Sequence, residues 1–215
     1  MTMARKTAWE DVAVHIKTMV FDGELRRDER VPQDEIAADL GVSRIPVREA
    51  LIALQRESWV RMIPHRGAFV VGFDDSSVTD HYAVLGRIYG LVAERAAERA
   101  TPEHVAELVA LHKALLAATS ADAFSTANDA LLGALRRVGG SPRISAILRS
   151  IAGIVPGNFF ALVEGTQEIQ TKGLGKAIKA IKAGDPEAAE VAMIAVMADQ
   201  GDAVRRLMRA RGVIT

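Results

Sequence analysis

Two arginines four residues apart, Arg44 and Arg48, carry the side chains in this sequence best suited to recognition chemistry. They follow a turn at Gly41 and open a segment with helical periodicity, so both guanidinium groups fall on the first turns of one predicted helix. There a guanidinium can donate a pair of hydrogen bonds to O6 and N7 of guanine, which discriminates between bases by about 1–3 kcal/mol. Ile45 is suited to contact a thymine methyl group. The candidate DNA contacts at this leading edge are Ser43, Arg44, Ile45, Val47 and Arg48.

A second basic point is predicted at the tip of a β-hairpin. Two β-prone runs, 59–63 and 68–71, flank a turn that contains His65, Arg66 and Gly67. These three residues are candidate contacts to phosphates or to the minor groove. Between positions 43 and 67 the sequence has five arginines and two acids, although the net charge of the whole chain is zero. The positive charge is therefore local, which suits a site-specific reader better than a general nucleic-acid coat.

Helical periodicity and turn residues predict the elements that position these groups. The N-terminal part should contain three helices, at 8–22, 33–40 and 44–57, followed by the hairpin. After a polar break at 73–77, amphipathic segments predict six further helices, at 76–99, 102–118, 120–138, 142–163, 166–183 and 185–211. The predicted fold is mainly α: a winged helix-turn-helix over residues 1–73, followed by an antiparallel six-helix bundle over residues 74–215.

Composition narrows the classes of function. There are no cysteines, and no apolar run approaches the roughly 18–20 residues needed to cross a bilayer, so we expect a cytoplasmic protein without a membrane partner. The chain shows no nucleophile elbow, phosphate-binding glycine loop, metal-ligand set or convincing pair of carboxylates, so we expect no enzyme. An enzyme built on a helical bundle and an adaptor that has lost DNA binding are the competing classes, and the arginines at 44 and 48 argue against the adaptor.

The stretch from Gly41 to Leu51, GVSRIPVREAL, resembles the recognition-helix signature of the GntR family of bacterial transcription regulators. The segments EIAADL at 35–40 and PHRGAFVV at 64–71 extend the resemblance across the N-terminal domain. The threonine usual after the first arginine is Ile45 here, and Asp34 stands where some FadR-like members carry a DNA-contacting arginine. One recognition helix reads only a few base pairs, so we expect a homodimer on an inverted repeat in double-stranded operator DNA.

The helical remainder resembles the FCD domain, the effector domain of FadR-like members, in its shorter VanR-like form. The resemblance implies that residues 74–215 bind an effector and dimerise. Members commonly hold a divalent metal through an Asp or Asn and three histidines, and the metal then holds a carboxylate effector. Asn128 matches the first ligand, whereas Leu132, Leu174 and Val196 stand at the three histidine positions. An aliphatic side chain cannot coordinate a cation, so we expect no metal and no cofactor.

Two interpretations of the C-terminal domain follow. In the first, the pocket persists as an apolar cavity for a lipophilic effector, and its candidate lining is Tyr82, Leu85, Tyr89, Asn128, Leu132, Leu174 and Val196. In the second, these side chains fill the core, and the protein is a constitutive dimeric regulator whose C-terminal domain binds no ligand. The resemblance itself implies a repressor that an effector releases from DNA.

Overall fold

The computed structural model describes residues 7–151 and 153–214, which belong to two compact units. The N-terminal unit comprises the chain up to Asp74 together with two short segments, Gly153–Gly157 and the residues from Met208 onward. The C-terminal unit comprises Asp75–Ala152 and Asn158–Leu207. The main division along the chain therefore falls between Asp74 and Asp75.

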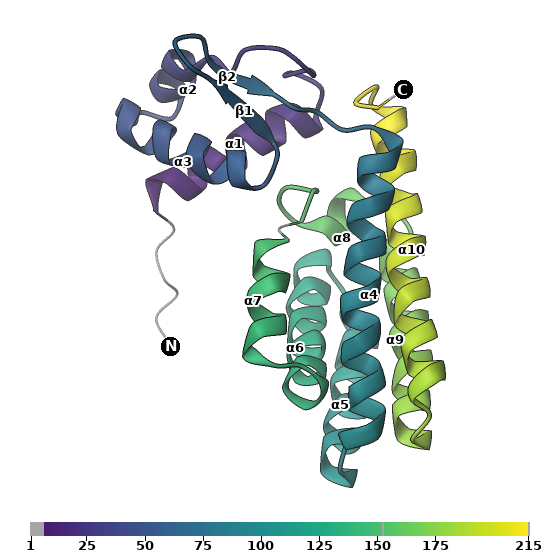
Figure 1. Ribbon diagram of the computed structural model, residues 1–215. Helices are drawn as coiled ribbons and strands as arrows, with labels where there is room; N and C mark the ends of the chain where they lie inside the picture. The colour runs from purple at the N-terminus through teal and green to yellow at the C-terminus, as the bar shows by residue number, and fades with distance from the viewer. Residues whose placement is uncertain (1–6, 152, 215) are drawn as a thin grey trace. The chain divides into compact units, whose positions relative to one another are not determined.

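Three helices and a two-stranded hairpin form the N-terminal unit, as the sequence predicts (Figure 1). Helix α1 spans Ala8–Phe21, α2 spans Gln33–Asp39 and α3 spans Arg44–Arg56, while strands β1 and β2 span Val60–Ile63 and Gly67–Val70. The helices share a core whose largest members are at most 1% exposed: Ile16, Phe21, Ile36, Leu51 and Leu54. Burial of each such side chain contributes about 1.5–3 kcal/mol, which holds the three helices together.

The hairpin is antiparallel, with Val60 paired to Val70 and Ile63 paired to Gly67. The segment before α2 joins its edge. The Val31 amide donates to the Ala68 carbonyl at 2.9 Å, and Arg30 forms an isolated bridge with Phe69. The sequence pattern indicates only a turn-rich connection here. The pairing places residues 28–31 beside the hairpin and so ties it to the start of α2.

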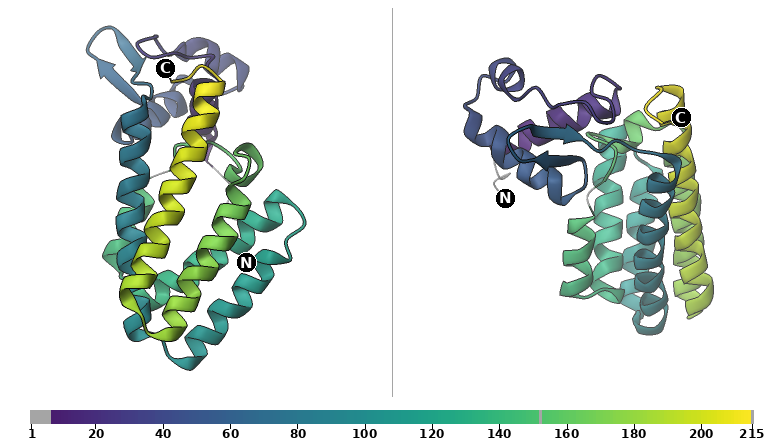
Figure 2. Two further views of the ribbon diagram at one scale, coloured as in Figure 1. Left: turned by 90° about the vertical axis from the view of Figure 1, so that its right-hand side faces the viewer. Right: turned by 45° about the horizontal axis from the view of Figure 1, so that its top comes forward.

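The C-terminal unit contains helices and no strands over its described residues (Figure 2). Its elements are α4 (Asp75–Arg99), α5 (Pro102–Leu116), α6 (Ala121–Gly139), α7 (Pro142–Ser150), α8 (Phe159–Leu162), α9 (Thr166–Ala183) and α10 (Pro186–Ala210). Helices α6 and α9 each pack against both α4 and α5. No described helix is long and apolar enough to cross a membrane.

The prediction of a single helix at 142–163 is wrong. Helix α7 ends at Ser150, and a non-helical stretch precedes the short α8. Pro156 lacks an amide hydrogen and disfavours helical geometry at the residue before it, and Gly157 adopts φ +76°. Asn158 then caps α8, because its side-chain oxygen accepts a hydrogen bond from the Phe160 amide at 3.1 Å. The described residues of this unit therefore form seven helices rather than six.

Two glycines allow the helices of the C-terminal unit to approach closely. A Cβ on Gly139 of α6 would lie 1.8 Å from the carbonyl oxygen of Val92 in α4. A Cβ on Gly173 of α9 would lie 1.9 Å from Val196 Cγ2 in α10. Neither position has room for a side chain, so the α4–α6 and α9–α10 contacts require glycine there.

Candidate nucleic-acid interface

The turn between α2 and α3 sets where α3 begins. Gly41 adopts φ +63°, a left-handed conformation that glycine takes without strain. The Val42 amide donates to the Ala37 carbonyl at 2.9 Å and so satisfies one of the last carbonyls of α2. Ser43 is the N-cap of α3, with an extended backbone and no capping hydrogen bond from its side chain. The hydroxyl of Ser43 is exposed at the start of the helix.

Four of the five residues predicted at the leading edge of α3 are exposed: Ser43, Arg44, Ile45 and Arg48. Ile45 is 68% exposed, which suits an aliphatic side chain that is covered by a partner. Val47 is 0% exposed, so its prediction as a DNA contact is wrong. Its side chain lies on the face of α3 that carries Ala50, Leu51 and Leu54, all of which are buried in the core.

Arg44 and Arg48 differ in their partners. Arg44 Nε lies 2.8 Å from Asp34 Oδ1, and both side chains are more than two-thirds exposed. Arg48 forms no ion pair within residues 7–151 and 153–214. An exposed ion pair contributes only about 0–1 kcal/mol, so a DNA phosphate or base edge can displace Asp34 from Arg44 at little cost.

Arg30 is a further candidate contact that the sequence analysis does not single out. It lines a cavity of about 640 Å³ together with Arg44 and Arg48. Its side chain also reaches the hairpin, since a Cβ on Gly67 would lie 3.2 Å from Arg30 Nε. Arg30 thus places a third guanidinium group between the start of α3 and the hairpin tip. In the sequence, Arg30 is one of several charged residues before Pro32, and nothing marks it among them.

The hairpin tip carries the three other residues predicted as DNA contacts. His65 and Gly67 both have positive φ, +60° and +100°, and the Arg66 amide donates to the Ile63 carbonyl at 3.0 Å to close the turn. His65 and Arg66 are exposed, and Gly67 is half-buried. The guanidinium carbon of Arg66 lies 5.8 Å from the centre of the Phe69 ring. This contact supports a cation at the tip, where it can meet a phosphate.

The residues predicted to line an apolar effector pocket lie mostly in the core of the C-terminal unit. Five are buried, namely Tyr82, Asn128, Leu132, Leu174 and Val196, whereas Leu85 and Tyr89 are half-buried. Tyr82 packs against α10, where a Cβ on Gly201 would lie 2.8 Å from Tyr82 Cβ. Tyr89 and Val196 line two different cavities. This packing favours the interpretation in which the buried side chains fill the core.

A chain of three buried amides joins α6, α9 and α10. Gln170 Nε2 donates to Asn128 Oδ1 at 2.6 Å, and Gln200 Nε2 donates to Gln170 Oε1 at 2.7 Å. All three residues are at most 6% exposed. Buried polar groups are stable when they are paired in this way. Neither glutamine was identified as a candidate from the sequence. Each lies four residues from a position discussed above, Leu174 or Val196, but nothing in the sequence indicates that they meet.

The residues of this region do not fit a metal ion. The side-chain oxygen of Asn128, which matches the first ligand position, already accepts the hydrogen bond from Gln170. Leu132, Leu174 and Val196 offer no donor atom. Within the part of the chain that the structure describes, no three His, Cys, Asp or Glu side chains gather in a group that could hold a metal.

A winged helix-turn-helix with exposed arginines at the start of its recognition helix, linked to an all-helical unit, defines a class of DNA-binding transcription regulators. Residues 9–70 match the family described as bacterial regulatory proteins, gntR family, and residues 80–199 match the FCD domain. The chain belongs to the GntR family, and its C-terminal unit is an FCD domain. It is a regulator that binds DNA and not an enzyme. The finer assignment to the VanR-like form stays a prediction.

Individual relatives agree with this assignment. An uncharacterized HTH-type transcriptional regulator of Mycobacterium tuberculosis is 31% identical over 193 residues, which cover 86% of this chain and 76% of that protein. The gluconate operon transcriptional repressor of Bacillus licheniformis is 27% identical over 106 residues, which cover 49% of this chain and 43% of that protein.

Solved structures share the fold. Lar, which controls the expression of the Listeria monocytogenes agr system, aligns with a TM-score of 0.64 and 17% identity over 95% of this chain and 99% of that one. McbR/YncC of E. coli aligns with a TM-score of 0.61 and 20% identity over 94% of this chain and 99% of that one. At these identities the likeness concerns the fold alone.

Proposed function

We propose that this protein is a transcription repressor that binds an inverted repeat in operator DNA as a homodimer and is released by an effector bound in the C-terminal unit. The observation that carries the proposal is the exposed edge of α3, where the guanidinium groups of Arg44 and Arg48 flank the 68%-exposed Ile45. Guanine edges and a thymine methyl group are the matching features of a major groove. Arg30 and Arg66 add phosphate contacts that fix the register on the duplex.

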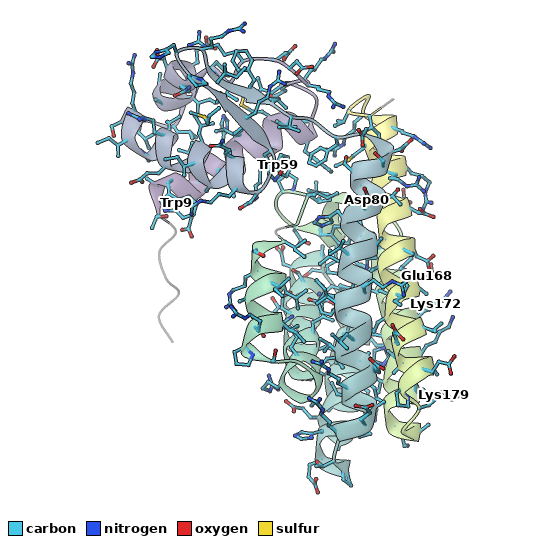
Figure 3. The ribbon with its side chains drawn as sticks, viewed as in Figure 1. Trp9, Trp59, Asp80, Glu168, Lys172 and Lys179 are labelled. Atoms are coloured by element: carbon cyan, nitrogen blue, oxygen red, sulfur yellow. The ribbon has the colours of Figure 1, made fainter. Side chains whose placement is uncertain are left out.

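The outer face of α9 and α10 supports the homodimer. An apolar groove of about 450 Å³ lies there, and its lining includes Val191, a large apolar side chain that is 59% exposed. The rim carries both signs of charge, from Lys179 and Asp185, and Figure 3 shows Lys179 projecting from the bundle. Across a two-fold axis, the same patch meets itself, so opposite charges on the rim can pair between copies.

The geometry gives little support to the expected lipophilic effector. A lipophilic effector among Leu132, Leu174 and Val196 would need open space, whereas α9 and α10 are in direct contact beside Val196. Asn128, one of the polar residues in the candidate lining, already accepts a hydrogen bond from Gln170. These contacts favour an effector site elsewhere in the unit.

Binding to the DNA upstream of the protein's own gene tests the proposal. The full-length protein should bind an inverted repeat from that region much more tightly than a duplex that carries one half-site, and added salt should weaken both complexes. The Val191→Glu variant should shift the protein from dimer to monomer in light scattering and reduce the preference for the repeat. Leu116→Glu, at an equally exposed position on α5, is the matched control. Equal affinity for the repeat and the half-site would contradict the dimeric reader.

A further inference from the structure

A cleft of about 620 Å³ opens between α4, α6 and α7 within the C-terminal unit. Its walls come from regular helix faces. Gly133, Arg136 and Arg137 lie on α6, and Ser145 and Arg149 follow one face of α7, while Gly140 and Ser141 cap the two helices where they meet. We call this space the α6–α7 cleft; its polar side chains are Tyr89, Arg136, Arg137, Ser141, Ser145 and Arg149.

The charged side chains that line the α6–α7 cleft are all positive. Three guanidinium groups line it, and no carboxylate does. Arg137 is paired with Glu107 at 2.5 Å, but Arg136 and Arg149 form no ion pair with any other described residue. The guanidinium groups of Arg136 and Arg137 converge over Gly133, because a Cβ there would lie 3.8 Å from the first and 3.9 Å from the second. Like charges that converge in a recess favour an anion between them.

The hydroxyl group of Tyr89 is a further hydrogen-bond donor in the α6–α7 cleft, next to Arg136. Arg136 Nη1 donates to the phenolic oxygen of Tyr89 at 3.2 Å, which leaves the hydroxyl hydrogen of Tyr89 to donate in turn. Burial of Tyr89 raises the pKa of its hydroxyl, while Arg136 opposes that shift, so the group stays protonated at neutral pH. Asp129 also lies within electrostatic range of this hydroxyl but does not line the cleft. The Arg136–Tyr89 pair is thus a fixed arrangement of donors.

We propose that the α6–α7 cleft binds a small organic anion, a carboxylate or a phosphate ester, through Arg136, Arg149 and Tyr89. Guanidinium groups match the planar oxygens of both kinds of anion and need no metal to hold them. The site is separate from the positions that correspond to the family's metal ligands, since Asn128, Leu132, Leu174 and Val196 do not line the cleft. The inference deepens the proposed function, on which it rests, by giving the effector a place and a chemical class.

The test measures anion binding by the full-length protein without DNA. Benzoate and citrate probe carboxylates, glycerol 3-phosphate and inorganic phosphate probe phosphates, and benzamide and glycerol are the neutral counterparts. At constant ionic strength, millimolar concentrations of at least one charged probe should raise the melting temperature, and the neutral compounds should not. A response to carboxylates alone or to phosphates alone identifies the source of the anion.

Two variants locate the binding. Arg149→Gln removes an exposed guanidinium group of the cleft, and Gly133→Leu fills its floor on a helix that tolerates leucine. Each should weaken the responding probe about 10-fold or more in calorimetric titration, as expected when a charge-assisted hydrogen bond or the space itself is lost. Arg143→Gln, an exposed arginine on the same α7 that does not line the cleft, should bind like the wild type.

The proposal is overturned if no charged probe raises the melting temperature above that of a chloride control, or if Arg149→Gln and Gly133→Leu bind as tightly as the wild type. Operator binding is measured separately on the same samples. A protein that binds the operator but no anion refutes this inference alone, and a protein that binds anion but no operator refutes the proposed function.

Discussion

Replacing Asp34 by asparagine should strengthen DNA binding, although Asp34 is not itself proposed to contact DNA. In the free protein its carboxylate lies 2.8 Å from Arg44 Nε, so Arg44 must leave this partner before it can bind a base or a phosphate. The side chains are 77% and 69% exposed, so the pair is screened by water and breaking it costs about 0.2–1 kcal/mol. Removing that cost alone predicts a gain in operator affinity of about 1.4- to 5-fold. The loss of repulsion between the carboxylate and DNA adds to the gain at low salt.

Fluorescence anisotropy with a labelled operator duplex, at several salt concentrations, measures this effect. The gain of Asp34→Asn should shrink as salt rises, because it is electrostatic. Asp39→Asn is the matched control: it removes the same charge from the other end of α2, where the described structure shows no ion pair. An equal gain from the control would mean that net charge, and not release of Arg44, is responsible. Unchanged or weaker binding by Asp34→Asn would refute the reasoning.

Three further predictions concern the C-terminal unit. Gln170→Leu leaves the amides on both sides of it without partners and should lower the free energy of unfolding by about 2–4 kcal/mol in urea titration; a loss below 1 kcal/mol would argue that the amide chain is not formed. Gly173→Ala should cost about 1–3 kcal/mol through its clash with Val196, and adding Val196→Ala should recover part of the loss; additive losses would contradict the contact. Burial lowers the pKa of His81, whose Nε2 has no partner in the described structure, so the folded state binds fewer protons than the unfolded state. The melting temperature should therefore hold above pH 6.5 and fall below it, and a His81→Gln variant should lose less over the same range.

Much of the N-terminal unit follows from local pattern. The glycine turn, the 3.6-residue periodicity of α3 and the β-prone runs around 64–67 predict the elements and the exposed arginines. Val47 shows that not every residue of a recognition-helix motif contacts DNA. It lies four residues before Leu51, a core residue, so the same periodicity places it on the buried face. Arg30 could not be assigned, because its position depends on pairing with Phe69, 39 residues away.

The C-terminal unit is harder to predict because its important contacts join distant parts of the chain. Pro156 and Gly157 are a local signal for the helix break. The prediction of one continuous helix followed instead from the apolar residues on either side, whose spacing continues a single amphipathic pattern. The amide chain has no such signal. Asn128 and Gln170 are 42 residues apart, and they meet because α6 and α9 both pack against α4 and α5. The α6–α7 cleft likewise depends on a distant contact, because Tyr89 of α4 lies about 45 residues before the nearest of the other lining residues on α6 and α7.

The central claim is that the start of α3 enters the major groove, and the operator affinity of Arg48→Ala tests it most directly. Arg48 is exposed and unpaired among the described residues, so its removal should change the free energy of unfolding by less than about 0.5 kcal/mol. Operator affinity should fall about 5- to 150-fold, the equivalent of 1–3 kcal/mol, and discrimination against a changed base pair should weaken. Arg56→Ala, at the other end of the same helix, should bind nearly as well as the wild type. Unchanged operator affinity in a folded Arg48→Ala protein would contradict the account.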